Sequence, residues 1–218
     1  MKLIRFGEAG RETPGIIMDD AMRLDVSALV RDYDEAFFAS DGLPQLKQWL
    51  TENEASAPRV PQSVRLGPPI ARPSKIVCIG LNFRDHAQES KMEIPKEPVI
   101  FFKATTSLVG PNDDLLMPKD GQKVDWEVEL AVVIGKRGTY VEREEALEYV
   151  AGYVLTTIIP NAHFNSSGAD NGSRERVRIH LRHWGQSWQH VTRFPTPAAW
   201  ECGLKLTASR DNIVPPAR

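Results

Sequence analysis

Apolar and polar positions alternate strictly over residues 123–135, KVDWEVELAVVIG. A period of two is that of a β-strand, whose successive side chains point to opposite faces. One face carries Trp126, Val128, Leu130 and Val132, and the other carries Glu127, Glu129, Ala131 and Val133. The pattern therefore predicts a strand with two glutamates on one face of an otherwise apolar element.

The first 53 residues are predicted to form a small N-terminal α/β module. Apolar runs and turn residues indicate strands at 2–6, 15–18 and 23–26 and helices at 28–33 and 43–50. Ser27 is placed to cap the first of these helices. Nothing in this stretch suggests catalytic chemistry.

Residues 54–73 contain five prolines, a density typical of a linker, so a larger domain is expected to begin at residue 74. Its predicted elements are a buried strand at 75–79, a helix capped by Asn82, a strand at 98–103, the glutamate strand, a helix at 142–149 and a strand at 151–156. After Thr156 neither the helical nor the strand period persists.

Composition indicates a cytoplasmic protein. The chain of 218 residues has two cysteines, no apolar run of membrane-spanning length and no signal-peptide pattern at its start. A net charge of −2 argues against a general nucleic-acid binder, and we expect neither a nucleic-acid nor a membrane partner.

The charge is distributed unevenly along the chain. Residues 157–218 hold eight of the 27 basic and four of the 29 acidic residues, so they carry +4 and the first 156 residues carry −6. Four of the five histidines also follow residue 156. The composition therefore changes at the point where the periodicity stops.

Glu127 and Glu129 are about 7 Å apart along one face, close enough for both carboxylates to bind one cation. Side by side on a half-buried face they repel each other and lose hydration. A hard cation such as Mg²⁺, Mn²⁺ or Ca²⁺ removes both penalties, because these ions prefer oxygen ligands. The alternative is an edge strand whose glutamate face is simply hydrated.

Three other side chains are candidates for chemistry. His86 and Glu89 are three residues apart on a predicted helix, where a carboxylate orients an imidazole and raises its basicity, as in a general base. A solvated surface pair is the alternative. Lys103 ends an apolar strand and either binds an anionic substrate or marks the exit of the strand to solvent.

The first 156 residues resemble the fumarylacetoacetate hydrolase family. The resemblance lies in KIVCIGLNFRDHAQE (75–89), EPVIFFKATTSLVGPND (97–113), DWEVELAVVIGK (125–136) and YVAGYVLT (149–156). It implies an α+β protein in which the small module precedes a mixed β-roll, here truncated after residue 156, and a homodimer when the chain is full length.

The family resemblance also implies a site and a reaction. Glu127 and Glu129 match metal ligands, His86 and Glu89 match a catalytic pair, and Lys103 matches a substrate-binding lysine. The implied reaction cleaves a C–C bond in a 2,4-dioxo acid through a metal-stabilised enolate. Decarboxylation, isomerisation or hydration of a related 2-oxo acid is the alternative on the same scaffold, and fold does not choose among them.

The family's third metal ligand, an aspartate after the last matched strand, has no counterpart, since the chain continues with Thr157, Ile158 and Ile159. The chain as written is therefore also compatible with a truncated, inactive fragment. A zinc site formed by His180, His183 and His190 is a further alternative, although no cysteine pair supports it.

Residues 157–218 are interpreted as an out-of-frame translation caused by one lost nucleotide near codon 157. Codons allowed for this tail, shifted by one base, permit N-D-x-S-E-R-A-F-Q-L-E-R after Thr156, which resembles the family's continuation. The shifted frame places an aspartate at position 158 and lysines near 174 and 176. The tail as written is expected to be poorly ordered.

Overall fold

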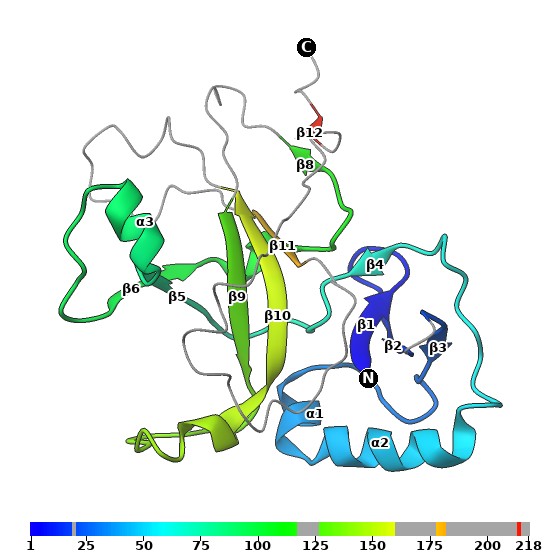
Figure 1. Ribbon diagram of the computed structural model, residues 1–218. Helices are drawn as coiled ribbons and strands as arrows, with labels where there is room; N and C mark the ends of the chain where they lie inside the picture. Colours follow the sequence, from blue (N-terminus) through cyan, green and yellow to red (C-terminus); the bar gives the residue numbers. More distant parts are fainter. Residues whose placement is uncertain (19–20, 117–126, 160–177, 182–212, 215–218) are drawn as a thin grey trace.

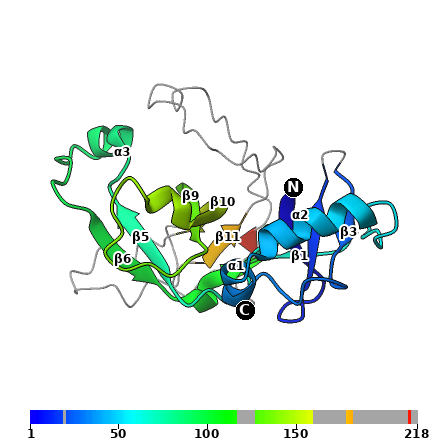
Figure 2. The same ribbon diagram turned by 90° about the horizontal axis from the view of Figure 1, so that it is seen from below.

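A computed structural model describes residues 1–18, 21–116, 127–159, 178–181 and 213–214 (Figure 1). Residues 1–73, called here the N-terminal region, contain a four-stranded antiparallel sheet in the order β3-β2-β1-β4. Its strands are β1 (Lys2–Phe6), β2 (Thr13–Ile17), β3 (Arg23–Asp25) and β4 (Leu66–Gly67). Helix α2 (Gly42–Asn53) runs alongside this sheet, as both views show (Figures 1 and 2).

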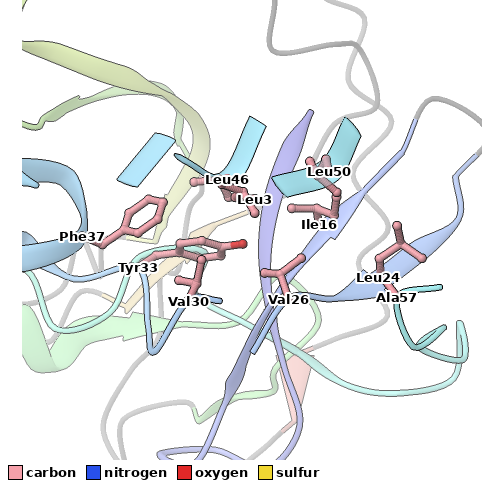
Figure 3. Close-up of a cluster of buried hydrophobic side chains, with 10 residues drawn as sticks. All are labelled: Leu3, Ile16, Leu24, Val26, Val30, Tyr33, Phe37, Leu46, Leu50 and Ala57. Atoms are coloured by element: carbon pink, nitrogen blue, oxygen red, sulfur yellow. The ribbon is translucent and has the colours of Figure 1, made fainter. Parts of the chain in front are cut away.

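The core of the N-terminal region lies between its sheet and α2 (Figure 3). Ile16, Leu24 and Leu46 are completely buried there. Tyr33 is also completely buried, and its hydroxyl donates a hydrogen bond of 2.8 Å to the carbonyl of Gly15. This bond satisfies the one polar group of a large apolar side chain, so Tyr33 anchors its loop to β2.

The helix predicted at 28–33 is wrong. Residues 28–33 form turns, and the Ser27 N–H donates to the side chain of Asp25 instead of Ser27 capping a helix. The helix begins later, as α1 (Glu35–Ala39), where the Asp34 side chain accepts the N–H of Phe37 at 3.0 Å. Burial of Tyr33 holds the preceding residues in a non-helical path.

The segment expected to be a linker, 54–73, packs against the N-terminal region. Ala57, Val60, Leu66 and Ala71 in it are buried, and β4 pairs with β1. Its Arg65 forms two hydrogen bonds of 2.6 Å to the carboxylate of Asp113 and one of 3.1 Å to Glu12. This arginine therefore ties the N-terminal region to the turn at 110–113.

The turn at 110–113 also shows why its first residue is glycine. The Gly110 N–H donates a 2.7 Å bond to the Asp113 carboxylate. A Cβ at Gly110 would collide with the carbonyl oxygen of Leu66, so only glycine allows the backbones to approach this closely.

Residues 74–159, called here the site-bearing region, contain an antiparallel hairpin and three strands of a four-stranded mixed sheet. The hairpin β5 (Ile76–Gly80) and β6 (Val99–Lys103) is antiparallel. A mixed sheet has the order β7-β11-β10-β9, with strands β7 (Leu108–Val109), β9 (Glu127–Ile134), β10 (Val150–Ile159) and β11 (Arg178–Leu181). In this sheet β11 pairs with β7 in parallel, whereas β10 pairs with β11 and with β9 in antiparallel orientation.

The remaining short elements are α3 (Arg84–Glu89), η1 (Thr105–Ser107), β8 (Leu115–Leu116), η2 (Ala146–Tyr149) and β12 (Ile213–Val214). Strand β12 pairs with β8. Both views place α3 and the β5–β6 hairpin on the side of β9 and β10 away from the N-terminal region (Figures 1 and 2).

Three predicted features of the site-bearing region need correction. The helix predicted at 142–149 is a turn followed by the 3₁₀ helix η2. Asn82 does not cap α3, whose N-cap residue is Phe83. The strand at 75–79, expected to be buried, leaves Val77 and Ile79 exposed.

Strand β10 extends past the expected end at Thr156 to Ile159, and β11 lies where no element was predicted. The expectation of a poorly ordered tail otherwise concerns residues outside the described ones. Trp126, His183 and His190 also lie outside the described residues.

Candidate functional site

The glutamate strand has the two faces that its pattern predicts. Along β9 the exposed fraction alternates from Glu129 to Ile134, with Leu130, Val132 and Ile134 exposed. Ala131 and Val133, on the glutamate face, pack against buried Val154 of β10. Glu127 and Glu129 therefore lie on the face that packs on Val154, where Glu129 is half-buried and Glu127, at the start of the strand, is exposed.

The register of β10 decides what lies beside the glutamates. Thr156 pairs with Glu129 and Ile158 pairs with Glu127. Directly opposed residues in antiparallel strands share a face, so both β10 side chains stand on the glutamate face. Both are buried, with exposed fractions of 4% for Thr156 and 8% for Ile158. Position 158 is thus an apolar neighbour of two carboxylates.

The electrostatics of the site favour a cation. Burial and the negative charge of Glu127 raise the pKa of Glu129 above its ordinary value, and the charges of His86 and Lys103 act against that rise. Glu127, His86 and Lys103 therefore each act electrostatically on Glu129. The two neighbouring cationic groups do not fully compensate the paired carboxylates, which is the condition that a divalent ion relieves.

His86 and Glu89 lie on α3, and both are exposed. No hydrogen bond or ion pair among those found between described residues joins these two side chains. Buried Ala87 attaches this helix to the protein. The helix places the imidazole within electrostatic range of Glu129, which the i, i+3 spacing alone does not predict.

Lys103 is the last residue of β6 and pairs with Ile76 of β5. Because opposed residues share a face, Lys103 stands on the side of the hairpin from which Ile76 packs against the Val154 cluster. Its Nζ is 5.2 Å from the centroid of the Phe101 ring, a cation–π distance. The ring therefore holds the ammonium on the side of the hairpin that faces β9.

The carboxylate oxygens of Glu127 and Glu129 are ligands of the type that a hard cation prefers. The described residues contain no group of three or more His, Cys, Asp or Glu side chains placed to hold a metal. Two carboxylates on one face are nevertheless the protein ligands that Mg²⁺ commonly uses, with waters or substrate oxygens filling the other positions.

Two clefts, of about 360 and 320 Å³, lie elsewhere, around Arg23 and Asp114 and around Arg5 and Arg72. None of the five candidate residues lines either cleft. Sequence reasoning missed the charged side chains at these clefts, because arginines and aspartates scattered along a chain give no periodic signal.

The family model for the C-terminal domain of fumarylacetoacetate hydrolase matches residues 75–157. Over these residues the chain belongs to the fumarylacetoacetate hydrolase family. The matched range contains all five candidate residues, each of which the sequence had assigned by resemblance to this family.

The chain is similar in sequence to a curated enzyme and in fold to two solved structures. A 2,4-didehydro-3-deoxy-L-rhamnonate hydrolase from Sphingomonas sp. (strain SKA58) is 47% identical over 156 residues, which are 71% of this chain and 52% of the relative. The structure of a probable 2-hydroxyhepta-2,4-diene-1,7-dioate isomerase from Mycobacterium abscessus is 27% identical, with a TM-score of 0.67, covering 89% of this chain and 67% of its own.

A third similar structure is a maleylpyruvate hydrolase from Sphingobium sp. SYK-6 in complex with manganese(II) and pyruvate. It is 22% identical, with a TM-score of 0.65, covering 84% of this chain and 65% of its own. The chain spans about half the length of the curated relatives it matches. None of the helices in the described residues is long and apolar enough to cross a membrane.

Proposed function

We propose that the site-bearing region is the metal-binding part of an enzyme that cleaves a C–C bond in a 2,4-dioxo acid. The observation that carries this proposal is the face of β9 shared by Glu127 and Glu129, with His86 and Lys103 close enough to act electrostatically on Glu129. Two acids, a base and a cation on one side of a sheet are the parts that such a hydrolysis needs.

Glu127 and Glu129 would hold Mg²⁺, Mn²⁺ or Ca²⁺. The ion, when bound, supplies a Lewis acid that polarises the 2-oxo group of the substrate. The half-buried position of Glu129 limits competition from bulk water. Its raised pKa also means that Glu129 keeps its proton to higher pH than an ordinary glutamate, so a cation that binds there has to displace that proton over a wider pH range.

Lys103 binds the substrate carboxylate, because its ammonium stands at the end of β6 facing the glutamate strand. His86 removes a proton from the attacking water, and Glu89, three residues further along the same helix, orients the imidazole. The water oxygen adds to the distal carbonyl carbon, the C–C bond breaks, and the proton held at His86 passes to the departing carbon.

Isomerisation of a related 2-oxo acid is the second candidate. It is favoured by the similarity to the probable isomerase from Mycobacterium abscessus. Both reactions use the same charged groups, but only hydrolysis needs a base acting on water. His86→Ala distinguishes them, since it should depress hydrolysis strongly and isomerisation less.

Binding of Mn²⁺, measured by calorimetry, tests the metal site without requiring turnover. Mn²⁺ is the first ion to try because the maleylpyruvate hydrolase of similar fold was solved with it. Glu127→Ala and Glu129→Ala should each weaken binding by about tenfold or more. Glu148→Ala, which removes an exposed glutamate of η2, is the matched control. Equal affinity in all four proteins would contradict the proposal.

A further inference from the structure

The cleft around Arg5 and Arg72 lies where the N-terminal region meets the site-bearing region, since residues of both line it. Its volume of about 320 Å³ is at the lower end of the range for small-molecule sites. None of the five candidate residues lines this cleft, so it is distinct from the candidate metal site. Its charges and its apolar wall indicate what it can bind.

Two of the three arginines that line the cleft are already paired with carboxylates. Arg5 donates to both carboxylate oxygens of Asp32, at 2.6 and 3.0 Å. Arg65 donates to both carboxylate oxygens of Asp113, each at 2.6 Å. Glu12 accepts a 3.1 Å hydrogen bond from Arg65 and forms a 3.5 Å ion pair with Arg5. These two arginines therefore offer little uncompensated charge to a ligand.

Arg72, the third arginine of the cleft, is compensated least. Its one ion pair among the described residues, with Asp32, is 4.0 Å long, and that carboxylate already accepts two hydrogen bonds from Arg5. The Arg72 side chain is also 82% exposed, so this contact contributes little. One positive charge at the cleft can therefore pair with a bound anion.

The backbone of Arg72 is held in a left-handed conformation, with φ at 43°. This φ is unfavourable for a residue with a Cβ, and the proline that follows at 73 favours an extended conformation instead. The preceding Ala71 is buried, and its N–H donates a 2.9 Å bond to the carbonyl of Tyr33, so the surrounding fold imposes the strain. Strain of this kind is typical of functional positions.

The cleft also has an apolar wall, formed by Pro68, Ile70, Leu108 and Val109. Ile70 and Leu108 pack against Val154 as well, which fixes them in place. Phosphate has no group to place against such a wall, and the carboxylates of the cleft would repel its second charge. A short hydrocarbon chain that ends in one carboxylate matches both the wall and the single charge of Arg72.

We propose that this cleft binds a small monocarboxylate with a short apolar chain, and that Arg72 pairs with its carboxylate. A planar guanidinium can donate two parallel hydrogen bonds to a carboxylate, which gives the contact direction as well as charge. The binding site is independent of the proposed function, because the cleft and the candidate metal site share no residue.

Titration of the full 218-residue chain with butanoate tests this site. EDTA is present, so metal binding plays no part, and the backbone amide signals of Thr105 and Val109, which line the cleft, report binding by NMR. Butanamide has the same shape without the charge, and acetate lacks the chain. We expect each to bind at least about tenfold more weakly than butanoate. Equal affinity for butanoate and either control compound would overturn the proposal.

Two variants remove the charge of Arg72 and keep its backbone conformation accessible. Glycine and asparagine tolerate a positive φ, so neither Arg72→Gly nor Arg72→Asn should lower the melting temperature, and both should weaken butanoate binding at least about tenfold. Arg59→Ala, which removes an exposed arginine outside the cleft, and Lys103→Ala should leave the affinity unchanged. Full affinity in both Arg72 variants, or an equal loss with Arg59→Ala or Lys103→Ala, would overturn the assignment.

Discussion

The N-terminal region and the site-bearing region differ in whether their hydrophobic side chains are buried or exposed. Among the described residues, fourteen of the seventeen buried hydrophobic side chains lie in residues 1–73, whereas thirteen of the fourteen exposed large ones lie after residue 73. The N-terminal region closes its own core around Tyr33, Leu24 and Leu46. The site-bearing region carries the candidate site residues, and most of the exposed large hydrophobic side chains among the described residues lie in it.

The same contrast holds for charge. Burial raises the pKa of Glu12, but hydrogen bonds from its own backbone N–H, Arg65 and Gly10 and the charge of Arg5 outweigh it, so the pKa is lowered overall. Burial and Glu127 raise the pKa of Glu129. Glu12 has its cationic partners in place, whereas the two cationic groups near Glu129 do not offset its burial and the charge of Glu127.

Restoring one nucleotide near codon 157 should have the largest effect. If residues 157–218 are translated out of frame, as we propose, the repaired gene supplies an aspartate at position 158, where this chain has Ile158. Activity towards a dioxo acid should rise by at least about a hundredfold, the scale of adding one electrostatic stabiliser at a reacting centre. Resequencing decides the genetic part. The proposal is falsified if the unrepaired gene encodes His163 through Arg218 and yields a soluble, metal-dependent enzyme.

Truncating one leucine in each region should give unequal losses of stability. Leu46→Ala empties a completely buried site and should cost about 2–5 kcal/mol. Leu130→Ala removes a side chain that is 37% exposed and should cost less than about 1 kcal/mol. Urea unfolding followed by Trp49, which packs against the N-terminal core, measures the first change, and circular dichroism measures the second. Losses of similar size would mean that the side chain of Leu130 is buried against a partner rather than exposed.

Ile158→Asp should strengthen the metal site. The side chain at 158 stands beside Glu127 on the glutamate face, so a third carboxylate there should tighten Mn²⁺ binding by about tenfold, or about 1.4 kcal/mol. Without metal the buried carboxylate should lower the melting temperature, and Mn²⁺ should raise it again.

Two variants control this experiment. Thr157→Asp places the carboxylate on the opposite face of β10, since Thr157 pairs with Val128. Ile158→Asn has the size and burial of the aspartate without its charge. A gain in Mn²⁺ affinity from either control equal to that from Ile158→Asp would show that the register does not decide the site.

Glu12→Gln should have the smallest effect and a definite pH dependence. The Glu12 carboxylate is 6% exposed and bridges Arg5 and Arg65, so losing its charge should cost about 1 kcal/mol at neutral pH. Because the folded-state pKa is lowered, this contribution is present above the unfolded pKa and lost as pH falls through the folded pKa. The difference between parent and variant should therefore shrink between about pH 5 and pH 3. A difference that grows on acidification would reverse the assigned sign.

The sequence by itself determined the elements whose side chains alternate. The strict period of residues 127–134 fixed both the strand and the face on which its glutamates stand, because side-chain direction in a strand follows from backbone geometry alone. Four motifs in order also indicated the family, which the family model over residues 75–157 supports, whereas the five candidate residues stay a prediction.

The tertiary structure decided the features that depend on partners distant in sequence. Residues 28–33 have helical spacing but are held in turns by the burial of Tyr33, and 54–73 is proline-rich but is fixed by Arg65 and β4. The neighbour of Glu127 is Ile158, 31 positions along the chain, because the register of β9 with β10 brings them together. A local pattern contains no information on pairings of this kind, since they are set by which apolar faces find cover and which do not.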